Sequence, residues 1–294
     1  MNTPQPLTLP TLTRETLLMS KPASISMCHE TQAIAARGWY TNMHGVQVDI
    51  RAARDGATQG RVSYRPGVAP AVGSPRHAHV YTFVYNQTTI AVAEARVAQG
   101  YRVAILNLAS AVSPGGGWLN GSQAQEESLA RASTLVHSLR DDEFYFDTSH
   151  HRNPFYNDTV IVSPAVPFFR HHEGQFIDTP WHADVITSAA VHAKAVHRYM
   201  PERSHEIALH MQYRTQKVFQ VATTLDADIL ILGAWGCGAF HNNPNDIAQI
   251  MRDMMDVVDM RRFVAIDFAV ADLYAPPLNY LAFARRFDGQ VFGG

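Results

Sequence analysis

Two nearly all-apolar segments, RVAILNLAS (102–110) and ADILILGAW (227–235), each run into a glycine-rich loop and then into an amphipathic helix. Short apolar runs without polar alternation are typical of strands that are buried on both faces of a sheet. Such a sheet needs helices on both sides, and parallel strands are usually connected by helices. The pattern therefore predicts an α/β fold with a largely parallel sheet.

Further strands and helices alternate along most of the chain. We expect strands within 79–86, 158–170, 175–190 and 262–270, where β-branched and aromatic residues are frequent. We expect helices within 26–38, 88–100, 124–139, 204–227 and 245–259. Residues 39–51 resemble a hairpin whose turn is Asn42–Gly45.

Length and composition favour one globular domain with extensions. The chain has 294 residues, of which 46% are hydrophobic, so a large core can form. Residues 1–28 are rich in Pro and Thr, and we predict a flexible N-terminal arm there. Residues 29–75 are predicted to be an accessory helix and hairpin packed on a core of residues 76–294, which includes a C-terminal tail.

Charge and cysteine content narrow the class of protein. The net charge is -2, which gives no broad basic field for nonspecific binding to nucleic acid. Cys28 and Cys237 form neither a disulfide framework nor a CxxC metal pattern. No run of 18 apolar residues and no secretory signal is found. We expect a cytoplasmic protein that binds no membrane and no sequence-specific nucleic acid, with a monomer as the default state.

The histidines do not predict a metal site. The chain has 15 of them, but adjacent pairs such as His150–His151 point to opposite faces of an extended chain. No HExxH or similar ligand spacing occurs. We therefore expect no metal and no cofactor.

The two glycine-rich loops favour the binding of an anion. They contain Gly115–Gly117 and the pair Gly236 and Gly238, at the strand ends where open α/β sheets bind ligands. Each loop runs into a helix N-terminus, where free N–H groups favour negative charge. Neither loop matches GxxxxGK[ST] or GxGxxG, so a nicotinamide dehydrogenase is not expected. Tight turns alone would also explain either loop.

Paired carboxylates follow the first glycine loop. Gln125, Glu126 and Glu127 begin the helix, and seven residues separate them from Gly117. Acidic residues are preferred in a first helical turn, and this preference alone would explain one glutamate. It does not explain why two glutamates face three consecutive glycines.

Three glycines, a seven-residue spacer and Gln-Glu-Glu resemble the signature of poly(ADP-ribose) glycohydrolases, whose catalytic fold is a macrodomain. The similarity is to the bacterial-type branch and extends from about residue 29 to residue 272. It includes, in the same order, HETQAIAARGWY, VYNQTTIAVAEA, AILNLASAVSPGGGWLNGSQAQEESLARAS, FYNDTVIVSPAVPFFR and ILGAWGCGAFHNNP. The resemblance implies a three-layer α/β/α macrodomain with a mixed, largely parallel sheet and an N-terminal helix and hairpin extension.

The resemblance also implies an activity. The family hydrolyses the ribose–ribose O-glycosidic bond of poly(ADP-ribose) and releases ADP-ribose, so the implied partners are poly(ADP-ribose), ADP-ribose and ADP-ribosylated proteins. Glu127 would be the catalytic acid, and Glu126 would hydrogen-bond ribose hydroxyls beside the scissile bond. The implied substrate contacts are Asn107, Ser110, Gly115, Gly116, Gly117, Gln125, Gly233, Trp235, Gly236, Cys237, Gly238, Ala239 and Phe240.

Different parts of the substrate are assigned to different members of this set. Asn107 and Ser110 would hold the terminal ribose, and the Gly115–Gly117 backbone would approach that ribose and the diphosphate. The amides of Trp235 to Ala239 would cradle the diphosphate from the other side. Phe240 would pack on the terminal ribose.

Helix geometry limits the mechanism. Neighbouring residues on a helix point about 100° apart. Glu126 and Glu127 therefore cannot lie on opposite sides of a glycosidic bond, as the two carboxylates of most glycosidases do. One carboxylate would protonate the leaving oxygen and then activate water, and the substrate's own diphosphate would stabilise the oxocarbenium charge.

Two other functions use the same loops. A macrodomain that binds ADP-ribose without cutting it would lack Gln-Glu-Glu at this spacing. A mono-ADP-ribosyl hydrolase would cleave a linkage to a protein side chain or a nucleic-acid base, and the sequence separates it poorly from a glycohydrolase. Asn86 and Gln87 are candidates either for contacting adenine or for capping the helix that follows.

Overall fold

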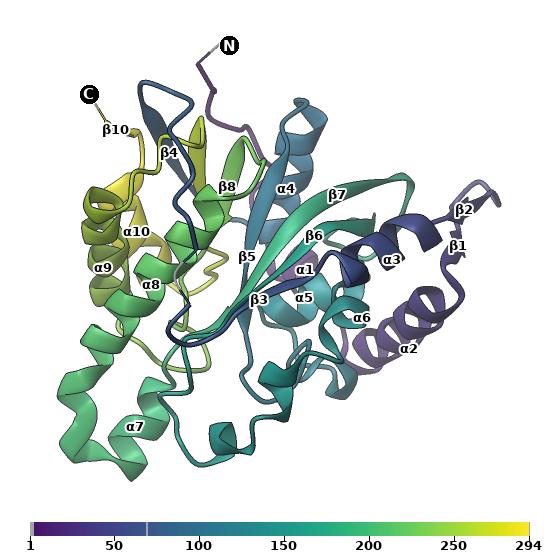
Figure 1. Cartoon of the computed structure of the whole chain (residues 1–294). Coiled ribbons are helices and arrows are strands. Elements are labelled where there is room, and N and C mark those ends of the chain that lie inside the picture. The colour runs from purple at the N-terminus through teal and green to yellow at the C-terminus, as the bar shows by residue number, and fades with distance from the viewer. Residues whose placement is uncertain (1–2, 69, 294) are drawn as a thin grey trace.

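An eight-stranded sheet forms the centre of the molecule (Figure 1). The computed structural model describes residues 3–68 and 70–293. In spatial order the strands are β10 (Gln290–Phe292), β4 (Val80–Tyr85), β9 (Ala265–Ala269), β8 (Ile229–Leu232), β5 (Val103–Ala109), β7 (Phe176–Ala189), β6 (Val160–Arg170) and β3 (Val62–Tyr64). The five strands from β4 to β7 run parallel, and β10, β6 and β3 pair antiparallel.

Helices cover both faces of this sheet. The α-helices outside the N-terminal extension are α4 (Thr89–Ala98), α5 (Gln125–Ala132), α6 (Leu135–Leu139), α7 (Ala193–Tyr199), α8 (Ile207–Thr223), α9 (Pro244–Val257) and α10 (Leu278–Phe287). Short 3-10 helices are η1 (Trp118–Asn120), η2 (Glu143–Phe146), η3 (Thr148–His151) and η4 (Pro201–Glu206). Figure 1 shows α8, α9 and α10 together on one side of the sheet and α4, α5 and α6 on the other.

Alternate side chains of the central strands enter two separate cores. Val103 and Ile105 of β5 join the apolar cluster under α4, α5 and α6. Ala104 and Leu106 join the cluster under α8, α9 and α10. Because side chains alternate across a strand, an all-apolar strand supplies both cores at once. The predicted three-layer α/β/α fold with a mixed, largely parallel sheet is therefore confirmed.

The first long helix begins earlier than predicted. Helix α2 spans Lys21–Arg37, so it crosses the boundary that we placed at residue 28. The Ser20 side chain accepts a hydrogen bond from the Ala23 N–H, and Pro22 occupies the first turn. This start signal was hidden because it lies in a Pro- and Thr-rich stretch.

The described residues before α2 contact the core. A short helix, α1 (Arg14–Leu17), precedes α2, and Leu12 is buried. The Leu7 N–H donates to the Tyr85 hydroxyl at 3.0 Å. The predicted arm therefore lies along the domain over this stretch.

The accessory segment and the C-terminal tail both extend the main sheet. After α2 come the hairpin β1 (Trp39–Thr41) and β2 (Gln47–Asp49), helix α3 (Arg51–Gln59) and the edge strand β3. At the other end, Phe283 and Phe287 of α10 are buried against Phe268, and β10 pairs with β4. The predicted C-terminal tail thus contributes to the apolar core, because these two aromatic residues lie one helical turn apart on the same face.

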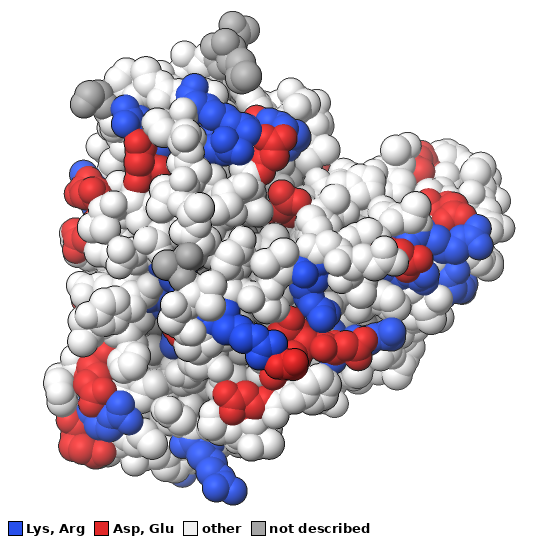
Figure 2. All heavy atoms as spheres, in the orientation of Figure 1, with Lys and Arg blue, Asp and Glu red and all other residues white. Residues whose placement is uncertain are grey.

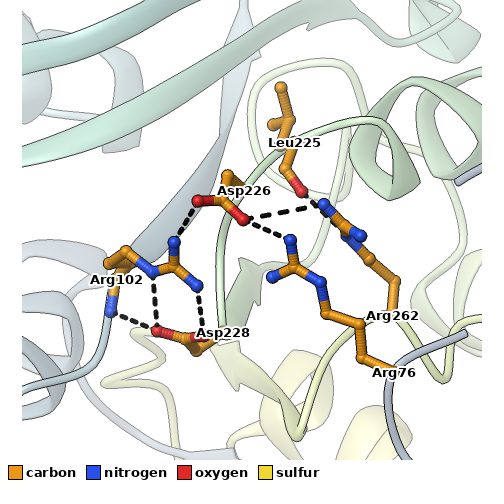
Figure 3. Close-up of polar contacts among 6 residues, drawn as sticks. All are labelled: Arg76, Arg102, Leu225, Asp226, Asp228 and Arg262. Carbon is orange, nitrogen blue, oxygen red and sulfur yellow. Dashed lines mark hydrogen bonds and ion pairs between the residues drawn. The ribbon is translucent and has the colours of Figure 1, made fainter.

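Charged residues lie at the N-terminal ends of the parallel strands, opposite the ends that carry the glycine loops. Near the starts of β5 and β8, Asp226 and Asp228 form ion pairs with Arg76, Arg102 and Arg262 (Figure 3). On the face drawn in Figure 2, basic and acidic side chains are interspersed, and neither sign forms a continuous field. Within the described ranges no helix has both the length and the apolarity needed to cross a bilayer.

Candidate active site

The two adjacent glutamates lie in the first turn of α5, after the first glycine loop and η1. Glu126 is 3% exposed and Glu127 is 8% exposed. The residue before the helix, Ala124, has no side chain that could cap its free N–H groups. Two neighbouring carboxyls buried at one helix N-terminus are costly for stability, and such arrangements are typical of functional sites.

Three N–H groups donate hydrogen bonds to the Glu126 carboxyl. Its Oε2 atom accepts the Ser110 N–H at 2.6 Å, and its Oε1 atom accepts the Gly115 N–H at 3.2 Å and the Asn107 Nδ2 at 3.4 Å. Burial raises the pKa of Glu126 to about 8, with a further rise from Glu127, against the lowering effect of these donors. Asn107 and Ser110 therefore fix this carboxyl.

Glu127 has one oxygen fixed and the other free. Its Oε1 atom accepts the Gly117 N–H at 2.9 Å. Its Oε2 atom is buried and has no hydrogen-bond partner among the described residues. Glu127 also lines the main cavity, so the structure provides a positioned carboxyl oxygen with nothing in the protein to bind.

The triple glycine encloses the two carboxyls. Gly115 and Gly116 have φ values of 80° and 62°, a region that favours glycine. A Cβ atom on Gly116 would lie 2.5 Å from Glu127 Oε1 and 2.9 Å from Glu126 Oε2. We predicted that the Gly115–Gly117 backbone faces the ligand; instead these glycines contact the glutamates, and the residues that line the cavity do not include them.

Gly116→Ala is expected to lower turnover by about 10²-fold, because the added methyl group displaces both carboxyls by a fraction of an ångström or more. The left-handed backbone adds a stability cost of about 1–2 kcal/mol. Steady-state kinetics and a thermal melt on the same preparation measure the two effects.

Gly45→Ala is the matched control for Gly116→Ala. Gly45 also has a positive φ, 76°, but no atom lies within 4 Å of the position of its Cβ. It should lose similar stability and keep wild-type turnover. Equal turnover in both variants would contradict the proposed contact between the loop and the carboxyls.

Gln125 attaches α5 to the sheet. Its Oε1 atom accepts the Leu108 N–H at 2.9 Å, and its Nε2 atom donates to the Leu106 carbonyl at 2.8 Å. Both bonds are to the last part of β5, so the residue before the glutamates sets the distance between the helix and the strand. Gln125 was predicted as a substrate contact. It lines the cavity, but its side-chain amide is hydrogen-bonded to β5.

The second glycine loop offers unpaired N–H groups to the same cavity. Gly236, Gly238, Ala239 and Phe240 line the cavity, and within the described chain their N–H groups donate to no protein acceptor. Successive free amides of this kind form a concave site for an anion. Phe240 stacks on His192 with ring centroids 4.4 Å apart.

Two of the amides that we assigned to the diphosphate are already used. The Trp235 N–H donates to the Gly233 carbonyl at 2.8 Å, and the Cys237 N–H donates to the Ala234 carbonyl at 3.0 Å. The loop folds on itself through these bonds, so the prediction for Trp235 and Cys237 as amide donors was wrong. The Trp235 indole is buried and donates to the Ser188 carbonyl at 3.2 Å.

Gly233 and Cys237 do not face the cavity. A Cβ atom on Gly233 would lie 3.1 Å from the Ala269 carbonyl oxygen, so this glycine allows close packing between strands. Cys237 lines a second cavity behind the loop. Burial raises the pKa of its thiol to about 12, which keeps it protonated and unreactive.

The cavity extends beyond the predicted residues. It measures about 330 Å³ and is also lined by Thr88, Arg131, Val270, Ala271 and Asn279. Val270 and Ala271 follow the last parallel strand, so the rule that ligands bind at strand ends would have found them. Asn279 lies in the predicted tail and had no signal in the sequence. Asn86 binds the Asp272 backbone instead of facing the cavity.

The histidine, cysteine and acidic side chains of the described residues include no group of three or more arranged to hold a metal ion.

The stability of Glu126→Gln relative to wild type is expected to rise with pH. In the unfolded chain a glutamate titrates near 4.3, whereas in the fold the pKa of Glu126 is raised to about 8. The folded wild type therefore binds the Glu126 proton more tightly than the unfolded chain does. The free energy of unfolding that this proton contributes is lost as pH rises from about 4.3 to 8. Thermal melts across this range should show a flatter pH dependence for the variant. Parallel curves would contradict a buried, proton-binding Glu126.

A mixed, largely parallel sheet between two helical layers, with glycine loops and buried carboxyls at the strand ends, defines a macrodomain-like α/β protein. A family model described as the catalytic domain of microbial-type poly(ADP-ribose) glycohydrolase (PARG) matches residues 28–171. No curated protein sequence gives a significant match.

Solved structures extend this similarity to most of the chain. The PARG of Thermomonospora curvata is 35% identical, with a TM-score of 0.81 over 90% of this chain and 100% of that chain. The same protein bound to the inhibitor ADP-HPD is 34% identical, with a TM-score of 0.80 over the same shares. The PARG of Deinococcus radiodurans in complex with ADP-ribose is 32% identical, with a TM-score of 0.74 over 81% of this chain and 98% of that chain. The chain belongs to the microbial-type poly(ADP-ribose) glycohydrolase family.

Proposed function

We propose that this protein is a poly(ADP-ribose) glycohydrolase, which hydrolyses the ribose–ribose O-glycosidic bond and releases ADP-ribose. The observation that carries the proposal is Glu127, whose Oε1 atom is fixed by Gly117 and whose buried Oε2 atom has no partner among the described residues. An acid catalyst needs such an oxygen, because it must carry a proton to a substrate atom at a fixed position. The ADP-ribose and ADP-HPD complexes of the relatives support the choice of substrate.

Glu127 acts as acid and then as base. Its Oε2 proton passes to the leaving ribose oxygen as the bond to the anomeric carbon breaks, and the bonding electron pair stays on that oxygen. A water molecule then adds to the anomeric carbon and returns a proton to Glu127. One carboxyl performs both steps, since Glu126 lies next to it on the same helix rather than across the bond.

Glu126 and the second loop position the substrate. Three of the about four lone-pair sites on the Glu126 oxygens accept N–H donors, which leaves one site on Oε2 for a ribose hydroxyl. The free amides of Gly236, Gly238, Ala239 and Phe240 suit a diphosphate, and this loop contains no lysine. The anionic diphosphate would then stabilise positive charge on the reacting ribose.

Release of ADP-ribose from purified poly(ADP-ribose) tests the proposal, with mono-ADP-ribosylated protein digested in parallel and ADP-ribose affinity measured by calorimetry. We expect rapid release from the polymer and binding of ADP-ribose. Cleavage of the mono-modified protein alone would instead indicate a mono-ADP-ribosyl hydrolase. Binding without any cleavage would indicate a binding module, and the absence of both would contradict the proposal altogether.

A further inference from the structure

A buried guanidinium lies one helical turn after Glu127. Arg131 is 4% exposed and lines the same cavity. Of the three other buried arginines, Arg96 and Arg170 have carboxylate partners, Asp267 and Glu30, and Arg214 donates to the Ala189 and Phe155 carbonyls. In residues 3–68 and 70–293, no carboxylate oxygen lies within 4.0 Å of the Arg131 guanidinium. A positive charge is thus buried beside the cavity without a directly paired anion.

Helix α2 and the loop before α5 hold this guanidinium with neutral groups. Arg131 Nη1 donates to the Ser24 Oγ at 3.1 Å and to the Ser122 carbonyl at 2.6 Å. Thr31 Oγ1 donates to the Arg131 carbonyl at 2.7 Å. Burial lowers the pKa of Arg131, but an arginine stays charged in proteins. The guanidinium is therefore fixed by Ser24, 107 positions earlier in the chain, together with the Ser122 carbonyl.

Helical spacing places this residue on the same helix face as Glu127. Residues four apart lie on the same helix face, with Cβ atoms about 5–6 Å apart. The titratable groups that face Arg131 are Glu127 from α5 and the Cys28 thiol from α2. Cys28 stays neutral because burial raises its pKa, more than Arg131 lowers it. Glu126 faces Glu127 from the same turn, and Tyr145 faces Glu126 from η2. Of these groups, only the Arg131 guanidinium carries a positive charge.

We propose that Arg131 is a positioning residue for the reaction, whose fixed positive charge stabilises the Glu127 carboxylate that forms when its proton passes to the leaving oxygen. This inference rests on the proposed glycohydrolase function, in which that carboxylate forms next to a second buried carboxyl. Helix α2 takes part by holding the guanidinium with Ser24. A carboxylate in a dry site gains much more from a neighbouring cation than it would in water.

Arg131→Met and Arg131→Lys separate charge from packing. We expect Arg131→Met to lower kcat by about 10- to 100-fold with KM changed by less than about 3-fold, because the interaction is stronger after proton transfer. Loss of a nearby cation also favours the protonated acid, so the alkaline limb of the pH–rate profile should move to higher pH. Arg131→Lys, which keeps a positive charge, should restore the position of this limb.

The control variant removes a contact to α2 without removing the charge. Thr31→Val loses the hydrogen bond to the Arg131 carbonyl, so it should lower Tm and leave the pH–rate profile in place. If Arg131→Met lowers only Tm or raises only KM, with an unmoved alkaline limb, the inference is overturned and Arg131 is structural.

A second measurement does not depend on turnover. NMR titration of the glutamate side-chain carboxyl carbons in wild type, Arg131→Met and Arg131→Lys reports the ionisation of the buried pair. We expect a higher midpoint in the Met variant and a wild-type midpoint in the Lys variant, and equal midpoints in all three would overturn the inference. If the midpoints move as expected but wild type releases no ADP-ribose, the proposed function fails while the charge effect stands.

Discussion

Glu127→Gln is expected to lower the rate of ADP-ribose release from poly(ADP-ribose) by about 10²- to 10⁴-fold, the contribution typical of a general acid. The amide keeps the size of the side chain, and its oxygen still accepts the Gly117 N–H. It has no carboxyl proton to give to the leaving oxygen and cannot take one from water. Protonation of the leaving oxygen and activation of water are therefore both lost.

Initial rates and ADP-ribose affinity, measured on the same preparations, decide this prediction. Affinity should stay within about 3-fold of wild type, because Glu127 acts on the bond rather than on the diphosphate. Glu143→Gln is the matched control, since this glutamate is exposed on η2 and should leave the rate unchanged. A Glu127→Gln variant that still cleaves at near wild-type rate would assign the proton transfer to another group.

Asp267→Ala is expected to lower the free energy of unfolding by about 3–5 kcal/mol. Asp267 on β9 and Arg96 on α4 are both 0% exposed, and the guanidinium donates to the two carboxylate oxygens at 2.6 and 3.0 Å. Removing the carboxylate leaves a cation in the core with no anion to compensate it. Denaturant unfolding followed by fluorescence measures the loss.

Two further variants test the cause of this loss. Asp256→Ala removes an exposed partner of Arg252 and should cost less than about 1 kcal/mol. The double variant Arg96→Met, Asp267→Leu replaces both charges with apolar groups and should be more stable than Asp267→Ala alone. If the double variant is the less stable of the two, the cost comes from packing and not from the unpaired charge.

The sequence was sufficient for the layered fold because its signals are local. RVAILNLAS and ADILILGAW are nearly all apolar, so both faces of these strands must be covered wherever they lie. The start of α5 after Gly115–Gly117 follows from helix and turn preferences within about ten residues. These short-range features were enough to place Glu126 and Glu127 at a strand end, beside a glycine loop.

Hydrogen-bond directions within the site were not predictable. The Gly115 and Gly117 N–H groups bind carboxyls rather than a ligand, and the Trp235 and Cys237 N–H groups close their own loop. A glycine in the sequence indicates where the backbone can approach another group closely, but not which group it approaches. That depends on the φ and ψ angles of the whole loop, which are set by the packing around it.

Contacts between distant segments were equally hidden. Thr31 and Arg131 are 100 positions apart, and Thr82 and Phe287 are 205 apart, yet each pair is joined by a hydrogen bond. The N-terminal segment and the C-terminal tail looked like extensions because neither has the composition of a core. By itself the sequence determined the layers, the family resemblance and the two carboxyls. Only the tertiary structure decided which groups hold those carboxyls, because the φ and ψ angles of the loop depend on the packing around it. It also decided which distant segments meet, because the closure of a long loop leaves no local pattern in the sequence.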